Sequence, residues 1–117
     1  MVLKGLGYCP VDSDYWDYED FDSYEEKGIE GTGCKAAFYW YGRGSYDGSG
    51  QMLALHEKGW YLFNLGHCSC YGPTENICFE GAATGESLES IKERCSEDYY
   101  VKEILPLVEL ALANGYK

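Results

Sequence analysis

The middle of the chain contains the stretch QMLALHEKGWYLFNL, residues 51–65. Its two apolar halves flank Glu57-Lys58-Gly59, which predicts a short hairpin turn in which the glycine supplies a positive φ. Alternation along the second half places Trp60, Leu62 and Asn64 on one face and Tyr61, Phe63 and Leu65 on the other. Because both faces are largely apolar, we expect residues 60–65 to form a central strand.

A second aromatic stretch, KAAFYWY at residues 35–41, lies between Gly33 and Gly42 and predicts another strand. The glycine-rich residues 42–50 are expected to form the loop that leads into the strand at 51–56. A further short strand is expected at residues 76–79.

The last third of the chain has helical periodicity. Thr84 or Ser87 can cap a helix over about residues 86–95. Ser96 can cap a second helix over about residues 97–114, which Asn114-Gly115 would end. The sequence therefore predicts one α+β domain, residues 1–117, with a small antiparallel sheet over about residues 35–79 packed by these C-terminal helices.

Pro106 interrupts the pattern of the second helix. Proline removes one backbone donor and its ring clashes with the preceding turn. We expect the helix either to kink there or to break at Leu105 and restart.

Composition limits the partners of this chain. Twenty acidic residues against nine basic ones give a formal net charge of −11. This charge disfavours direct binding of nucleic acid and of anionic membranes, and it favours basic proteins as partners. The start of the chain has no apolar run of signal-peptide length and no segment is long enough to span a bilayer, so we expect a cytoplasmic protein. Its six cysteines are then expected to be thiols or metal ligands rather than disulfides.

Residues 12–26 read DSDYWDYEDFDSYEE and contain eight carboxylates, five aromatic residues and no Lys or Arg. This acidic aromatic segment, which extends to residue 30, is expected to be irregular or to form a short helix pinned to the sheet by its aromatic residues. Carboxylates interleaved with aromatic anchors suit docking in a basic protein groove. The alternative is that the aromatic residues only hold the segment to its own sheet while the carboxylates are solvated. The predicted partner-binding residues are Asp14, Tyr15, Trp16, Asp17, Tyr18, Asp20, Asp22, Glu25 and Glu26.

A second cluster, His67-Cys68-Ser69-Cys70, carries ligands that zinc accepts, and Cys34 or Cys78 could complete a tetrahedral site. The spacing departs from the paired ligands of structural zinc sites. The alternative is that Cys68 and Cys70 are small buried residues at a strand end. We therefore predict no cofactor, with zinc held by His67, Cys68, Cys70 and either Cys34 or Cys78 as the alternative.

Catalysis by cysteine would require His67 or His56 as the base. His67 and Cys68 point to opposite faces if the strand continues, which disfavours that pair. Cys70 with His67 or with His56 remains geometrically open, but no catalytic signature surrounds these residues. The loop at residues 44–50 lacks the Gly-Lys-Ser/Thr ending of a phosphate loop. We predict no catalytic residues and no enzymatic activity.

Three pieces of sequence carry a resemblance: YDGSGQ at 46–51, GWY at 59–61 and LGHCSCYGP at 65–73. Together they resemble a pattern of small uncharacterised phage and bacterial proteins. The resemblance implies a phage setting, with the host cytoplasm as the location. By class analogy it implies an inhibitor of host defence, of the anti-CRISPR or anti-restriction kind, including DNA mimics.

The leading hypothesis is thus a non-enzymatic acidic inhibitor that docks on the basic, nucleic-acid-binding surface of a host defence protein such as a CRISPR effector or a restriction enzyme. The second hypothesis is a zinc-stabilised structural or interaction module, and the third is a small cysteine-dependent enzyme. A homodimer formed through the uncharged Tyr and Trp residues of the middle of the chain is left open.

Overall fold

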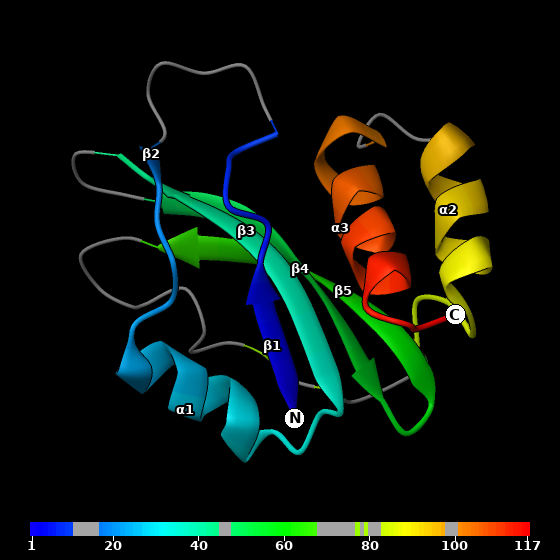
Figure 1. The fold of residues 1–117 in the computed structure, drawn as a ribbon, viewed down its shortest axis with the longest axis horizontal. Coiled ribbons are helices and arrows are strands. Elements are labelled where there is room, and N and C mark those ends of the chain that lie inside the picture. The colour runs from blue at the N-terminus through cyan, green and yellow to red at the C-terminus, as the bar shows by residue number, and fades with distance from the viewer. Residues whose placement is uncertain (11–16, 45–47, 68–76, 78, 80–82, 98–100) are drawn as a thin grey trace.

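The computed structural model describes residues 1–10, 17–44, 48–67, 77, 79, 83–97 and 101–117. Along the chain its elements are β1 (Val2–Gly5), β2 (Asp17–Tyr18), α1 (Ser23–Gly31), β3 (Ala36–Arg43), β4 (Gly48–His56), β5 (Gly59–His67), α2 (Leu88–Glu97) and α3 (Val101–Ala113). A mixed sheet and two C-terminal helices confirm the predicted α+β class (Figure 1).

The predicted hairpin is present and sets the register of the sheet. His56 pairs with Gly59 across a turn made by Glu57 and Lys58, and Leu53 pairs with Leu62 further along. Gly59 has a φ of 135°, which side chains rarely adopt, so a glycine is required there. The glycine-rich loop is shorter than expected, since β3 continues to Arg43 and β4 already starts at Gly48.

Two further strands pair with β3 on the side opposite β4. β1 is parallel to its first half, with Val2 opposite Ala36, and β2 is antiparallel to its end, with Tyr18 opposite Gly42. The strand order is β1-β3-β4-β5, so the sheet is mixed rather than purely antiparallel.

The prediction that residues 60–65 form a central strand is wrong, because β5 lies at the end of the strand order. Its alternation is as expected, with Trp60 and Leu62 on one face and Phe63 and Leu65 on the other. Both faces of β5 are apolar because each packs against one of the two hydrophobic clusters of the domain. The apolar faces do not require a neighbouring strand on both edges. Gly85 covers the start of the outer edge of β5 by exchanging backbone hydrogen bonds of 2.8 and 3.2 Å with Trp60.

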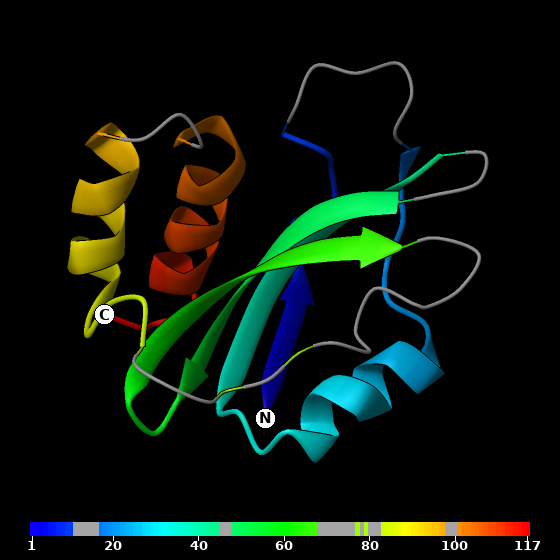
Figure 2. The same ribbon diagram turned by 180° about the vertical axis from the view of Figure 1, so that it is seen from behind.

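The sheet is the middle of three layers, and β3 alternates between its two faces. Ala36, Phe38 and Trp40 face one core, and Ala37, Tyr39 and Tyr41 face the other. The first core also contains Leu88, Ile91, Ile104, Leu107, Val108 and Ala111 of α2 and α3. The second contains Phe21 and Ile29, which belong to the acidic segment and α1. Figures 1 and 2 show α1 well separated from the α2–α3 pair.

The start of α2 is as predicted, whereas its end is not. The Ser90 N–H donates to Ser87 Oγ at 3.2 Å, which makes Ser87 the cap, while Thr84 Oγ1 accepts from the N–H of Leu62. Ser96 was predicted to cap the second helix, but α2 runs through it to Glu97. Neither Gly nor Pro stands next to Ser96 in the sequence to end the helix, so Ser96 lies within the last turn of α2 instead of capping the next helix.

α3 continues through Pro106 without a break. The buried side chains of Leu107 and Val108 hold the helix to the sheet and offset the hydrogen bond that proline removes. It ends as predicted: Gly115 has a φ of 89°, and the Tyr116 N–H donates to the Ala111 carbonyl at 3.2 Å. The Tyr116 ring then packs edge-on against Phe38 and Trp60.

The strand predicted at residues 76–79 is not supported where it can be assessed. Ile77 and Phe79 are in no strand, and residues 76 and 78 lie outside the described part of the chain. Phe79 covers the sheet with its side chain instead, stacking on His56 at a ring-centroid distance of 4.6 Å. Across the described residues, none of the helices is both long and apolar enough to cross a membrane.

Candidate functional site

The acidic segment leaves a row of carboxylates in solvent. We call it the acidic face and define it as the exposed residues Asp17, Glu19, Asp20, Asp22, Glu26 and Glu30. Two basic residues lie near it: Lys27, which is exposed on α1, and Arg43 at the end of β3. Asp14, Tyr15 and Trp16, which were predicted to bind a partner, lie outside the described residues.

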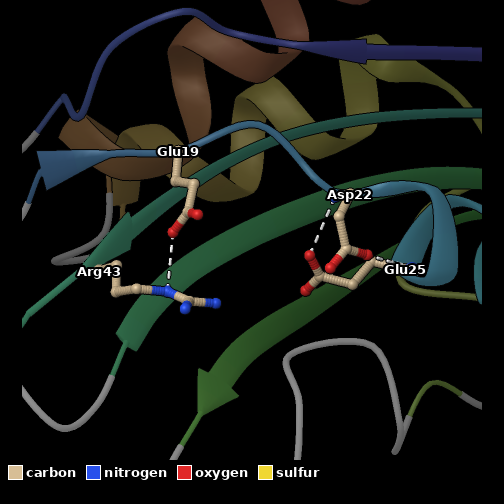
Figure 3. A network of polar contacts seen from close by, with 4 residues as sticks. All are labelled: Glu19, Asp22, Glu25 and Arg43. Atoms are coloured by element: carbon tan, nitrogen blue, oxygen red, sulfur yellow. Dashed lines mark hydrogen bonds and ion pairs between the residues drawn. The ribbon is translucent and has the colours of Figure 1, made fainter.

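The first part of the acidic face is tied to the end of β3. The Glu19 N–H donates to the Tyr41 carbonyl at 2.9 Å, and the Glu19 carboxylate lies 2.7 Å from Arg43 Nε (Figure 3). Both side chains are about half exposed, so water screens the ion pair and it contributes little to stability. A shallow depression of about 280 Å³ opens here, lined by Asp17, Tyr18, Glu19, Arg43 and Gly44.

Tyr18 is part of this region but is not an exposed anchor. Its hydroxyl donates to Asp20 Oδ1 at 2.8 Å and lies close beside the backbone of Gly5, the last residue of β1. Burial, and next the hydrogen bond to Asp20, raise the pKa of Tyr18 well above its ordinary value. Tyr18 therefore joins the acidic segment to the end of β1 as a neutral phenol.

The middle of the segment is held by a tyrosine of β3. The ring of Phe21 stacks on Tyr39 with a centroid distance of 3.8 Å, and the Phe21 N–H donates to the Tyr39 hydroxyl at 2.9 Å. Burial raises the pKa of Tyr39, so this hydroxyl is neutral at physiological pH. The expected pinning of the segment by an aromatic residue is confirmed at Phe21.

Two of the predicted partner-binding carboxylates build the start of α1 instead of facing solvent freely. Asp22 Oδ1 accepts from the Glu25 N–H at 2.8 Å, and Glu25 Oε1 accepts from the Asp22 N–H at 3.0 Å. This is a capping box, seen at the right of Figure 3, and it explains the regular nine-residue helix in a segment so rich in like charges. The Glu25 side chain is buried, and burial raises its pKa above the ordinary value.

Tyr41 carries a polar atom that the fold leaves unsatisfied. Its side chain is 1% exposed, and among the described residues its hydroxyl has no hydrogen-bond partner of acceptable geometry. Burial raises the pKa of Tyr41 to about 12, while the nearby Arg43 guanidinium opposes part of this rise. A raised pKa keeps the phenol neutral and makes it a poor nucleophile.

Among the described residues of the acidic segment, the exposed aromatic side chain is Tyr24, at 73% exposure, which was not among the predicted anchors. Its position follows from the capping box: with Asp22 as the cap, Glu25 and Ile29 face the sheet and residue 24 faces away. The pattern Asp-x-x-Glu at residues 22–25 is the sequence signal that could have identified it.

The predicted metal ligands fall mostly outside the described residues. Cys68, Cys70 and Cys78 are among those not described, and His67 is the last residue of β5, opposite Gly48. Cys34 is buried, with its sulfur 3.7 Å from the Met1 sulfur and 3.8 Å from the Ile29 carbonyl oxygen. Within the described residues no group of His, Cys, Asp and Glu is arranged to hold a metal, and the zinc site stays a prediction.

Comparison with known proteins gives no further assignment: no family model, no curated protein and no solved structure matches this chain.

Proposed function

We propose that this chain is a non-enzymatic acidic inhibitor whose acidic face docks on a basic, nucleic-acid-binding surface of a host defence protein, in the manner of anti-CRISPR proteins or DNA mimics. The observation that carries the proposal is the row of exposed carboxylates along β2 and α1 together with the exposed Tyr24. The setting in host defence rests on the sequence resemblance alone.

The proposal has a direct electrostatic basis. A groove that binds nucleic acid presents Lys and Arg side chains spaced for phosphates, and carboxylates can occupy the same positions. Charge complementarity of this kind chiefly accelerates association and makes binding sensitive to salt. With a net charge of −11, the whole chain adds a long-range attraction to such a groove.

The contacts within the segment refine the set of docking residues. Asp22 and Glu25 cap α1, and Tyr18 is engaged with Asp20, so their first role is to hold the segment. Asp17, Glu26 and Glu30 are exposed charges of the same acidic segment. Tyr24 is an exposed aromatic side chain that a partner can bury, which would lower the dissociation rate.

The test is capture of partners from nuclease-treated host lysate by wild type and two triple variants. One variant carries Asp17→Asn, Glu26→Gln and Glu30→Gln on the acidic face. The matched control carries Glu57→Gln, Glu86→Gln and Glu109→Gln, three other exposed carboxylates, and so changes the net charge equally. Both triple variants should fold as wild type by circular dichroism.

Wild type and the control should retain a nucleic-acid-binding protein that the acidic-face variant releases, and double-stranded DNA should compete with its capture. Adding Tyr24→Ser to wild type should weaken retention without changing the salt dependence. The proposal fails if the two triple variants behave alike, or if nucleic acid does not compete with the captured protein.

A further inference from the structure

A groove lies on the other side of the sheet from α1, where the first turns of α2 meet the last turn of α3. It measures about 690 Å³ and is lined by Ser87, Leu88, Glu89, Lys92, Glu93, Leu112 and Lys117. Leu88 is fully buried at its base, whereas Leu112 on its rim is 45% exposed. Exposed leucines are common singly, but this one borders a concave surface of ligand-site size.

The charges of this groove differ from those of the rest of the chain. Its rim carries two lysines, Lys92 and Lys117, and two glutamates, Glu89 and Glu93. The chain as a whole has nine basic and twenty acidic residues, so two copies repel each other over most of their surface. Among the residues that line the groove the opposite charges balance, so the repulsion between two copies is weaker there than over the rest of the surface.

We propose that this groove is the contact surface of a two-fold symmetric dimer of this chain. A two-fold axis presents the same patch on both sides, so the patch must complement itself. Glu89 and Lys92 are three residues apart and share one face of α2. When two α2 helices cross antiparallel about a point between them, Lys92 of each copy faces Glu89 of the other, and both Leu112 side chains are covered.

A second copy fits this rim better than other occupants. An anionic amphiphile would meet Glu89 and Glu93, and a basic peptide would meet Lys92 and Lys117. The dimer is also independent of the proposed inhibitor function, because the groove and α1 belong to opposite sides of the sheet. It would leave two acidic faces pointing outward, one from each copy.

Added salt should change the dissociation constant of the dimer in a direction opposite to its effect on docking of the acidic face. The two copies repel through their net charge of −11 each, and added salt screens this repulsion more than it weakens short contacts at the groove. Dimerisation should therefore strengthen with ionic strength, whereas docking of the acidic face on a basic partner should weaken.

The experiment is sedimentation velocity on the full chain from about 1 μM to about 1 mM, a range that brackets weak self-association. Leu112→Asp should raise the dimer dissociation constant about tenfold or more, because it places a charge in the apolar contact. Glu89→Lys and Lys92→Glu should each raise it about two- to fivefold, since each puts like charges face to face. The double variant with both changes should restore dimerisation toward wild type.

The matched control is Lys27→Glu on α1, which makes the same change of charge as Lys92→Glu on the opposite side of the sheet and should leave the dimer unchanged. Circular dichroism checks that each variant is folded. A wild type that stays monomeric up to about 1 mM overturns the proposal, as does a failure of the double variant to recover. Shifts of the Leu112 methyl NMR signals on adding decanoate or a Lys-rich peptide to a monomeric wild type would assign the groove to that ligand and would also overturn the dimer.

Discussion

On one face of β3, Phe38 meets Trp60 and the helices of the α2–α3 pair; on the other face, the neighbouring Tyr39 meets Phe21 of the acidic segment. The first face is closed mainly by apolar side chains and by the rings of Trp60 and Tyr116. The second is also largely apolar, but it buries Tyr39, Tyr41 and the Glu25 carboxylate as well, and buried polar atoms usually need partners. The first layer thus depends mainly on the apolar area it removes from water, and the second depends in addition on particular hydrogen bonds. The proposed docking surface is built on the second layer, whose stability depends on more individual contacts.

Deleting one aromatic ring from each face should give the largest effect. Phe38→Ala removes a fully buried ring packed against Trp60 and Tyr116, and should lower the free energy of unfolding by about 3–5 kcal/mol. Phe21→Ala should cost less, because its segment lies at the surface and can collapse onto the space. Urea unfolding followed by circular dichroism measures both, and equal losses would contradict the distinction between the faces.

Removing the hydroxyl of Tyr39 and removing that of Tyr41 should change the free energy of unfolding in different directions. Tyr39→Phe leaves the Phe21 N–H without its acceptor and should cost about 1–2 kcal/mol. Tyr41→Phe removes a buried hydroxyl that has no hydrogen-bond partner in the described part of the chain, and should be neutral or stabilise by up to about 1 kcal/mol. The same urea titrations decide, and a loss at Tyr41 as large as at Tyr39 would mean that its hydroxyl has a partner.

The Tyr41 variant also has a pH signature. A tyrosine whose pKa is higher in the folded state contributes stability that is present below the ordinary value of about 10 and is lost as pH rises through about 12. Tyr41→Phe should remove this alkaline loss.

Removing the cap of α1 should have an effect of about 1 kcal/mol, since Asp22→Ala leaves the N–H of Glu25 without its acceptor. Asp22→Asn keeps an acceptor oxygen and serves as the control. Amide hydrogen exchange should show faster exchange in α1 for the alanine variant while α2 and α3 keep their protection. Equal loss in all three helices would mean that the acidic segment unfolds only with the whole domain.

The smallest effect concerns the buried carboxylate. Glu25→Gln keeps an oxygen that can accept from the Asp22 N–H, so the capping box remains. Because burial raises the pKa of Glu25, its protonated form stabilises the fold at low pH, and that contribution is lost as pH rises through the raised pKa. The variant should match wild type in acid and be more stable by about a few tenths of a kcal/mol at neutral pH. The difference in unfolding midpoint between pH 4 and pH 7 tests this, and a constant difference would count against a raised pKa.

Local patterns were sufficient to predict much of the sheet and the second half of the chain. The β4–β5 turn follows from Glu57-Lys58-Gly59, the α2 cap from Ser87, and the end of α3 from Asn114-Gly115. Each of these depends on neighbouring residues alone, which is why a single sequence reveals it.

The parts that were missed depend on distant contacts. β1 and β2 are four and two residues long, too short to show periodicity, and they are strands only because β3 offers them an edge. β5 is apolar on both faces because Phe79 covers one face and the helices cover the other. In the sequence alone, a strand of this kind looks the same as a strand in the centre of a sheet.

The sequence predicted where the candidate site lies, but not which of its residues hold the segment to the sheet and which face solvent. Charge identified the acidic segment, and the residues that face solvent within it depend on where α1 begins. Once Asp22 is the cap, Glu25 turns inward and Tyr24 outward. Composition does not contain this information, whereas the spacing of Asp22 and Glu25 does.

The residues of α1 divide into a side that holds the helix to the sheet and a side that is exposed to solvent. Glu25 and Ile29 face the sheet, while Tyr24, Glu26, Lys27 and Glu30 face solvent. Under the proposed function, substitutions on the solvent side change which partner is favoured at little cost in stability, whereas substitutions on the inner side cost stability. Under selection by a partner that changes its own surface, such a helix can diversify quickly while the fold beneath it is preserved.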